Sequence, residues 1–339
     1  KVRSRIVADQ LVKLIKEADH VVIMGHRMSD LDAIGSAEGV LRICKICDVP
    51  AVIAVRRDAT LAGSLIDALC KAGQKDDFID PKDALPIISK KTLCIVVDTY
   101  QVDLVESKEI LEKCGKVAVI DHHRKGVGYI ENPVLVCHEP YSSSASELVT
   151  ELLQYVGDRD DKPNRVEAEG LLSGIMLDTQ DFTLHTGVRT FEAAAALRRY
   201  GAETERVRQL FDVSMVEYAA KAELVERAQM YKNCAISVGG EIAPEARVAI
   251  AQAANDLLRI QNVDASFVAV QVGSGVNISA RSLGAVNVQV IMESLGGGGH
   301  QTMAAAQLKH ITPEAARARI EDAIDQYWAS QKKSVAGEK

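Results

Sequence analysis

Short apolar runs alternate with longer amphipathic segments through the first half of the chain. Four runs rich in β-branched residues occur at 21–24, 51–55, 93–97 and 117–120. Unbroken apolar runs of this length predict strands buried on both faces, as in a parallel sheet. The segments between them, such as 33–46 and 61–71, predict helices. This strand–helix–strand order predicts an α/β fold in which a parallel sheet carries helices on both faces.

The pattern changes towards the C-terminus. Few turn formers and mixed apolar and charged residues predict a helical linker over 196–231. Beyond it, strands are expected at 235–238, 266–272 and 277–282, helices at 248–260 and 315–328, and a hairpin turn at Gly273-Ser274-Gly275. A chain of 339 residues usually forms two domains. We therefore expect four parts: a catalytic domain over 1–195, the linker over 196–231, a smaller α/β domain over 232–330 and a polar tail over 331–339.

Composition and charge limit the possible functions. The formal net charge is −7 and aromatic residues make up only 4% of the chain. An acidic surface with few stacking aromatics argues against binding long nucleic acid, but a small phosphate-bearing substrate could still bind a locally positive pocket. The seven cysteines are odd in number and mostly lie in apolar runs, which indicates reduced thiols rather than disulfides. No apolar run is long enough to span a membrane and no signal peptide is visible.

Candidate metal ligands follow three of the predicted strands. His26, Asp30 and Asp32 come after the first, Asp98 after the strand at 93–97, and Asp121-His122-His123 after the strand at 117–120. The carboxyl ends of parallel strands share one edge of the sheet, so these groups are expected to converge although they are distant in sequence. Each residue alone is more often a helix cap or a core histidine. Their joint occurrence is a stronger signal.

Asp178 adds a fourth carboxylate at the end of a predicted helix. A carboxylate is disfavoured at a helix C-terminus, and a bound cation would remove that penalty. Four carboxylates carry too much negative charge for one divalent ion. Together with the imidazoles of His26 and His122, they suit two ions better than one. Oxygen and imidazole ligands favour Mn²⁺, with Co²⁺, Fe²⁺ and Mg²⁺ as alternatives, and the lack of cysteine argues against structural zinc. A pair of such ions suits phosphoester hydrolysis.

Further residues are candidates for catalysis and substrate binding. Asp121 could orient the imidazole of His122, and His123 could donate a proton to the leaving oxygen or contact the phosphate. In the second domain, four glycines precede His300 and could bring backbone amides close to an anion. Arg281 could pair with a phosphate. A glycine run alone is more often a flexible turn, and a lone arginine more often a surface charge.

These motifs resemble the DHH phosphoesterase superfamily. The resemblance rests on His26-x3-Asp30-x-Asp32, Asp98 and Asp121-His122-His123, and on GGGGH at 296–300, which is similar to the glycine motif of the associated DHHA1 domain. It covers most of the chain. GHRMSDLDAIGSA, VVDTYQVDL, EPYSSSASELVTE and GIMLDTQDF are similar to the GdpP-type cyclic di-AMP phosphodiesterases of Gram-positive bacteria.

The resemblance implies hydrolysis of cyclic di-AMP to linear pApA with two divalent ions, Mn²⁺ being the expected one. It implies that His26, Asp30 and Asp98 bind one ion, and that Asp98 is shared with a second ion bound by Asp32, His122 and Asp178. Contacts with the substrate phosphate are implied for His123, Arg281, Gly297, Gly298, Gly299 and His300. It further implies a longer parent protein, anchored in the membrane by a segment absent here, with this part on the cytoplasmic side.

Two other functions remain open at the level of the sequence. One is an oligoribonuclease or pAp phosphatase, which would cleave short linear nucleotides on the same fold. The other is a module that binds a cyclic nucleotide without cleaving it, although competent side chains at every ligand position argue against a pure sensor. A cyclic dinucleotide is the expected partner and a homodimer is an open alternative, with no long nucleic acid and no direct membrane contact expected.

Overall fold

The computed structural model describes residues 2–123, 128–242, 248–299 and 301–336. The chain divides into two compact units, Lys1–Asp212 and Val213–Lys339. The division falls inside the segment 196–231 that the sequence predicts as a linker. Helices α8 (Val188–Arg199) and α9 (Thr204–Gln209) belong to the first unit, and α10 (Met215–Glu226) begins the second. Each unit is described by itself.

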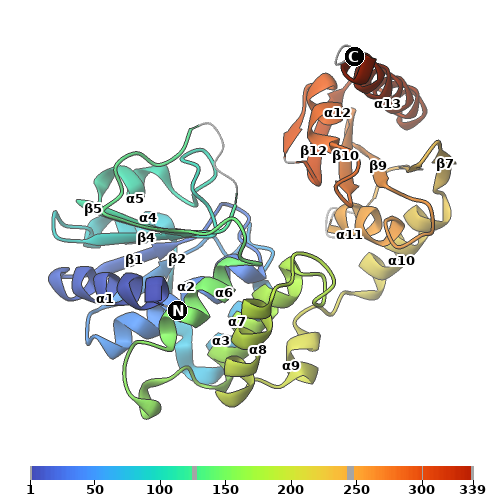
Figure 1. Cartoon of the computed structure of the whole chain (residues 1–339). Coiled ribbons are helices and arrows are strands. Elements are labelled where there is room, and N and C mark those ends of the chain that lie inside the picture. The colour runs from blue at the N-terminus through green and yellow to red at the C-terminus, as the bar shows by residue number, and fades with distance from the viewer. Residues whose placement is uncertain (1, 124–127, 243–247, 300, 337–339) are drawn as a thin grey trace. The chain divides into compact units, whose positions relative to one another are not determined.

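A six-stranded sheet organises the first unit (Figure 1). All neighbouring strands pair in parallel, in the order β3-β2-β1-β4-β5-β6. The strands are β1 (Val21–Met24), β2 (Ala51–Ala54), β3 (Phe78–Ile79), β4 (Leu93–Val97), β5 (Lys116–Asp121) and β6 (Leu135–His138). The predicted parallel sheet is confirmed. β3 and β6 are additional strands at its two edges.

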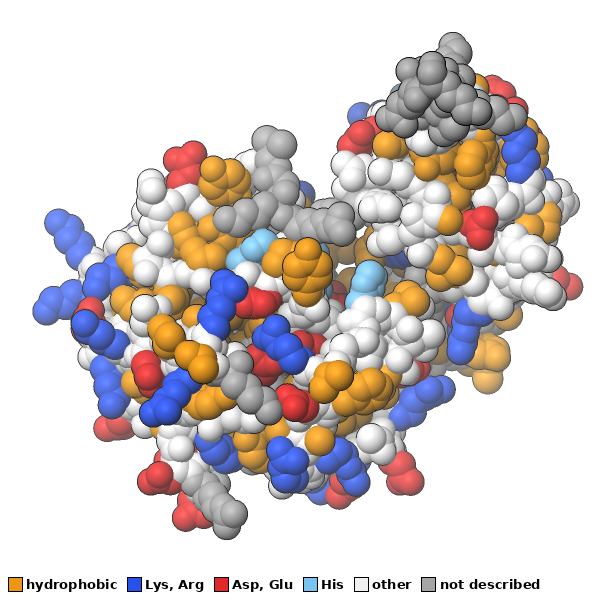
Figure 2. All heavy atoms as spheres, viewed as in Figure 1, with side chains coloured by type: hydrophobic (Ala, Val, Ile, Leu, Met, Phe, Trp, Pro, Cys, Tyr) orange, Lys and Arg blue, Asp and Glu red, His pale blue; other side chains and the backbone are white. Residues whose placement is uncertain are grey.

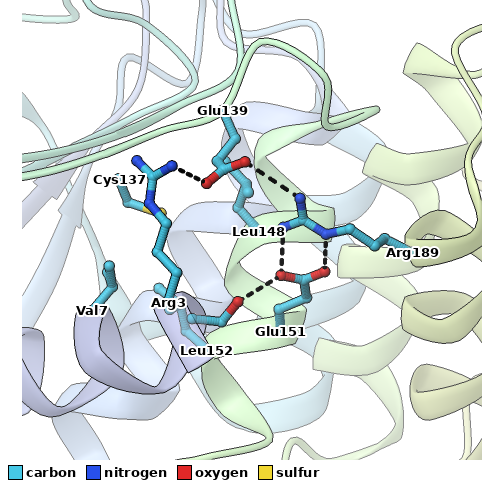
Figure 3. Close-up of a pocket in the computed structure, with 9 residues that line it drawn as sticks. Arg3, Val7, Cys137, Glu139, Leu148, Glu151, Leu152 and Arg189 are labelled. Atoms are coloured by element: carbon cyan, nitrogen blue, oxygen red, sulfur yellow. Dashed lines mark hydrogen bonds and ion pairs between the residues drawn. The ribbon is translucent and has the colours of Figure 1, made fainter. Parts of the chain in front are cut away.

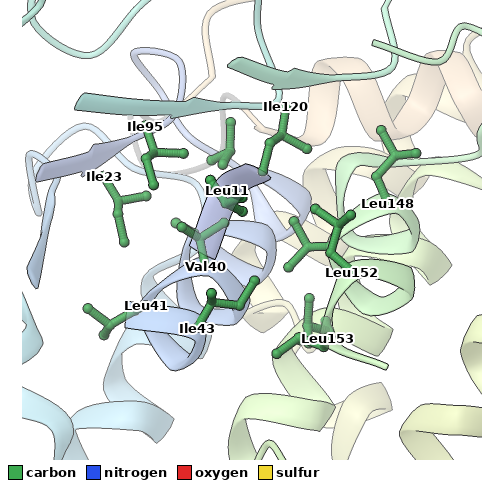
Figure 4. Packing of buried hydrophobic residues seen from close by; sticks show 14 of the residues in the cluster. Leu11, Ile23, Val40, Leu41, Ile43, Ile95, Ile120, Leu148, Leu152 and Leu153 are labelled. Atoms are coloured by element: carbon green, nitrogen blue, oxygen red, sulfur yellow. The ribbon is translucent and has the colours of Figure 1, made fainter. Parts of the chain in front are cut away.

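Helices cover both faces of this sheet, as predicted. Alternate residues of the central strands point to opposite faces, so Ile23 and Ile95 pack in one core whereas Val22 and Cys94 pack in another. Figure 4 shows the first core, where strand side chains meet Leu11, Val40 and Leu152 of three helices. The other helices of the unit are α1 (Val2–Glu17), α2 (Leu31–Ile46), α3 (Gly63–Leu69), α4 (Pro81–Ala84), α5 (Lys108–Lys113), α6 (Ala145–Leu153) and α7 (Arg165–Asp178).

Helices α2 and α7 cross with their backbones almost in contact. A β-carbon built on Gly35 of α2 would lie 2.4 Å from the carbonyl oxygen of Gly170 in α7. Any side chain at Gly35 would therefore push the helices apart. The crossing brings the first turn of α2 towards the last turn of α7, which are the helix ends that carry Asp32 and Asp178.

Ion pairs fasten helix α1 to the same unit (Figure 3). Arg3 binds Glu139 at 2.9 Å, and Arg189 of α8 binds both Glu139 at 3.3 Å and Glu151 of α6 at 2.7 Å. Ser4 donates a hydrogen bond to Glu151. Because Glu139 follows β6 directly and its amide donates to the carbonyl of Asp121, this network links α1 to the end of β5.

The second unit contains a mixed six-stranded sheet, in the order β11-β12-β10-β9-β8-β7. Its elements are β7 (Gln229–Tyr231), β8 (Cys234–Gly239), α11 (Val248–Leu257), β9 (Ala265–Val272), β10 (Gly275–Ser282), α12 (Val288–Ser294), β11 (Gly298–Gly299), β12 (Met303–Lys309) and α13 (Pro313–Ala336). β9 and β10 form the predicted hairpin, with Val272 opposite Gly275. α13 continues to Ala336, into the segment for which the sequence predicts a polar tail.

The surface of the first unit mixes acidic and basic side chains. Figure 2 shows red and blue groups interspersed on its visible face, without a broad field of one sign. This visible face offers no extended basic track for a polynucleotide backbone. Among the described helices, none combines the length and the apolar content that crossing a bilayer requires.

A buried acid lies behind the α2–α7 crossing. Glu38 of α2 is fully buried, and Gln74 donates one hydrogen bond to it and another, of 3.0 Å, to Glu167 of α7. Arg42 neutralises Glu167 through two hydrogen bonds, but within the described part of the chain no cation pairs with Glu38 and its Oε2 has no hydrogen-bond partner. Burial, with the neighbouring charge of Glu167, raises the pKa of Glu38 to about 8.

The raised pKa predicts a stability that depends on pH. An unfolded glutamate releases its proton near pH 4.5, whereas folded Glu38 keeps it to about pH 8. Stability from this group is therefore complete below pH 4.5 and is lost as the pH rises towards 8, by on the order of 2–5 kcal/mol. Glu38→Gln should reduce the loss in thermal unfolding midpoint between pH 5 and pH 9. The exposed Glu109→Gln is the matched control, and an equal loss in wild type and Glu38→Gln would contradict the assignment.

Candidate metal centre

Six predicted ligands meet at one edge of the parallel sheet. Asp98 follows β4 directly, and its backbone adopts a left-handed φ of 59° that asparagine and aspartate tolerate better than most residues. His122 follows β5, and Asp178 is the last residue of α7. Asp30 caps the N-terminus of α2, where its Oδ1 accepts from two backbone amides at 3.0 Å. Asp30 is thus both a helix cap and a candidate metal ligand.

The six side chains form two groups that share Asp98. In one group, the Nε2 of His26 lies 3.8 Å from an oxygen of Asp30 and 3.5 Å from an oxygen of Asp98. In the other, the Nε2 of His122 lies 3.1–3.8 Å from oxygens of three carboxylates: Asp32, Asp98 and Asp178. Within each group, one ligand atom from every residue lies within 4.8 Å of all the others. Each group therefore has dimensions that a single ion could bridge.

Unsatisfied polar atoms test whether a cation fits here. The Nε2 of His122 and the Oδ1 of Asp98 are buried and make no hydrogen bond. Leaving such atoms unpaired in the interior is costly. Both atoms are of the type that binds a divalent ion, and three carboxylates around one imidazole give the negative charge that such an ion needs. The residues present fit divalent metal ions.

Family models match both units of the chain. Residues 20–175 match the model described as the DHH family, N-terminal domain, and residues 243–330 match the DHHA1 domain. The chain contains a DHH-family domain followed by a DHHA1 domain. Its namesake tripeptide, Asp121-His122-His123, provides one of the six side chains through His122.

Curated relatives of this DHH protein share its two-unit sequence. It is 46% identical over 339 residues to "Cyclic-di-AMP phosphodiesterase GdpP" of Geobacillus thermodenitrificans, across 98% of this chain and 51% of the relative. It is 41% identical over 336 residues to "Cyclic-di-AMP phosphodiesterase PdeA" of Listeria monocytogenes, with the same shares covered. The chain thus spans about half the length of these relatives.

A solved structure has the same fold. An exopolyphosphatase-related protein from Bacteroides fragilis superimposes with a TM-score of 0.82 and 22% identity, covering 96% of this chain and 98% of that protein. At this identity the likeness concerns the fold alone. It extends over both units, which agrees with the α/β architecture expected from the sequence.

The DHH tripeptide differs in one respect from the sequence expectation. Asp121 was expected beside His122, but its Oδ1 accepts from the Nδ1 of His123 at 2.8 Å and from the backbone amide of His123. Alternation along an extended chain explains this, because residues two apart point to the same side and adjacent residues do not. Asp121 therefore orients His123. The Nε2 of His138 in turn donates to the carbonyl of His123 at 2.5 Å.

Charges in the centre strongly perturb its titrating groups. Burial opposes the charged form of His26, but Asp30 and Asp98 outweigh it and raise its pKa to about 11. Burial is likewise outweighed at His122, where Asp178 and Asp98 raise the pKa well above its usual value. Burial and the neighbouring carboxylates raise the pKa of Asp32. In the metal-free protein, protons on the two imidazoles therefore supply part of the positive charge that the carboxylates need.

Helix α6 holds Asp32, a contact for which the local sequence carries no direct signal. The amides of Ala145 and Ser146, in the first turn of α6, each donate to an Asp32 oxygen at 2.8 Å. A β-carbon at Gly174 of α7 would lie 2.6 Å from Asp32 Oδ1, so α7 has no room for a side chain at position 174. The Ser-rich start of α6 indicates a helix N-terminus, but which carboxylate lies there depends on the fold.

The predicted phosphate-binding residues lie in the DHHA1 unit. Arg281 is on β10, and its Nη1 donates to Ser279 Oγ at 3.0 Å and to the carbonyl of Ala280. Gly297 packs against Ala305 so closely that a β-carbon would lie 2.1 Å from its carbonyl oxygen. Gly298 and Gly299 form β11, antiparallel to β12. His300 lies outside the described residues. The structure thus brings Arg281, Gly298 and Gly299 onto one sheet, with Gly297 packed beside it.

Proposed function

We propose that this chain is a phosphodiesterase that hydrolyses cyclic di-AMP to linear pApA with two divalent ions, Mn²⁺ being the expected metal. The observation that carries the proposal is the pair of histidine–carboxylate groups that share Asp98. Identities of 46% and 41% to proteins named cyclic-di-AMP phosphodiesterases support the choice of substrate. The acidic surface with interspersed charges supports a small substrate over a polynucleotide.

In this proposal the six side chains hold the ions. His26, Asp30 and Asp98 would bind one, and Asp32, Asp98, His122 and Asp178 the other. When bound, such ions activate water and stabilise the negative charge that develops at phosphorus. Asp98 has one carboxylate oxygen within 3.5 Å of His26 and the other within 3.3 Å of His122, which supports its role as the bridge.

His123 is the proposed general acid. Its imidazole is 42% exposed, and its Nδ1 donates to the buried carboxylate of Asp121. Burial opposes the charged form, but Asp121 and Asp98 raise its pKa, which favours the doubly protonated ring that a general acid needs. In the reaction a water oxygen forms a bond to phosphorus and the bond to the ribose O3′ breaks. His123 would deliver a proton from Nε2 to that leaving oxygen.

Product analysis tests the proposal. Purified protein with Mn²⁺ should convert cyclic di-AMP to pApA, as detected by chromatography with mass spectrometry, and lose this activity in excess chelator. A panel of cyclic di-AMP, pApA, pGpG and pAp distinguishes the alternatives. Faster turnover of the linear nucleotides would favour an oligoribonuclease or pAp phosphatase. Tight binding of cyclic di-AMP without turnover, in metal-loaded protein, would favour a sensor.

A further inference from the structure

Strand β10 carries a row of polar side chains on one face of the DHHA1 sheet. Asn277, Ser279 and Arg281 alternate along the strand and therefore point to the same face. Their opposite neighbours on β9, which share that face, include Val268 and Val270, and these are buried in a core with helix α11. Polar residues in a row beside an apolar core are unexpected unless something polar contacts them.

The other side of this row is open. The neighbours of the same three residues on β12 are Gln307, Ala305 and Met303, and all three are exposed. Among the described residues, α11 therefore packs on this face over β9, whereas the β12 residues on the same face stay exposed, with β10 along the boundary. Asn277 and Arg281 are themselves half-buried, so a ligand could reach their side chains from the β12 side.

Two polar atoms in the row have no hydrogen-bond partner. These are Oδ1 of Asn277 and Nε of Arg281, both buried. Among the described residues, no carboxylate forms an ion pair with Arg281. A buried guanidinium nitrogen without an acceptor and a buried amide oxygen without a donor are both costly, so a ligand that supplies an anion and a hydrogen-bond donor would satisfy both.

The spacing of these groups matches a nucleotide. The guanidinium of Arg281 lies back over Ser279, to which it donates at 3.0 Å. Asn277 lies two residues from Ser279 along the strand, a distance of about 7 Å. In a nucleotide in its extended anti form, the N7 edge of the base faces its own 5′-phosphate, and a phosphate at Arg281 would place that edge near Asn277.

We propose that Asn277 reads the nucleobase of the substrate, pairing its carboxamide with N6 and N7 of an adenine whose phosphate is bound by Arg281. The carboxamide oxygen accepts from the N6 amino group while its NH₂ donates to N7, the pairing by which asparagine recognises adenine. Guanine presents two acceptors, O6 and N7, at this edge, so the carboxamide oxygen would face another acceptor. Asn277 thereby selects adenine over guanine. This inference rests on the proposed function, since it concerns the base of the same substrate.

Asn277→Ala tests the inference by comparing two substrates. The variant should lower kcat/KM for cyclic di-AMP about ten-fold or more, while kcat/KM for cyclic di-GMP changes little. Its thermal unfolding midpoint should stay the same, because no hydrogen bond within the protein is lost. Gln271→Ala is the matched control: it lies on neighbouring β9, on the opposite face, and should leave both substrates unaffected. Equal changes for both substrates, or no change, would overturn the inference.

A binding measurement separates this inference from the proposed function. Titration calorimetry with AMP and GMP requires no turnover. The wild-type protein should bind AMP more tightly than GMP, and Asn277→Ala should lose that preference. If this holds but cyclic di-AMP is not hydrolysed, the proposed function fails and the inference stands. If cyclic di-AMP is hydrolysed but the variant discriminates as well as wild type, the inference fails alone.

Discussion

Asp98→Ala should reduce the hydrolysis of cyclic di-AMP by about a thousand-fold or more, the largest effect that we expect from a single substitution. Asp98 is the one residue common to both ligand groups, so its loss weakens both ions at once. Other ligands serve one group each. The measurement is the initial rate of pApA formation at saturating Mn²⁺, together with the metal content of the purified variant by mass spectrometry.

Two further variants make this result interpretable. Asp98→Asn keeps the shape of the side chain and removes its charge, so it should fold like the wild type and still lose activity. Asp103 lies five residues from Asp98 and has an exposed carboxylate that pairs with Lys108. Asp103→Ala should therefore retain activity. An Asp98→Ala protein with a tenth of the wild-type rate or more would rule out a shared ligand at this position.

Metal binding should release protons at pH 7.5, at least one per chain. The pKa of His26 is raised to about 11 and that of His122 lies well above its usual value, because neighbouring carboxylates outweigh burial. The imidazole of His26 is therefore protonated in the metal-free protein and must lose its proton to bind an ion, and the raised pKa values of His122 and Asp32 favour further release. Affinity should consequently increase as the pH rises. Calorimetry of Mn²⁺ binding in two buffers that differ in ionisation enthalpy gives the number of protons directly.

Histidine variants assign these protons. His26→Ala should release about one proton fewer than wild type, because the variant lacks the His26 imidazole proton that the ion would displace. His310→Ala, an exposed histidine after β12, should leave the number unchanged. Binding of Mn²⁺ with no release of protons would mean that these imidazoles are not ligands.

The parallel sheet and the convergence of the ligands could be predicted because both depend on local patterns. The run 93–97 is apolar throughout and ends at Asp98, and parallel topology alone places its end beside that of the run 117–120. Other features carry weaker signals. Three of the seven residues of β12 are alanine, which has low strand propensity, and β6 has only four residues.

Pairings between distant residues could not be predicted from the sequence. The two amides that hold Asp32 are more than a hundred residues away from it, and nothing in the local sequence of either partner identifies the other. The partner of Asp121 was assigned to the wrong neighbour because the strand geometry at the DHH tripeptide decides it. The role of Asn277 depends on which face of the sheet α11 covers, a property of packing rather than of sequence pattern.

The ligand positions, which extend from residue 26 to residue 178, also bear on how long the protein survives in a cell. They come from four separate stretches of the chain, and ions bound there would tie these stretches together only in the folded state. Such binding lowers the population of opened forms, and opened forms are what proteases cleave. A shortage of metal would then remove the enzyme by degradation as well as by inactivation, so that the amount of the protein would follow the supply of its ions.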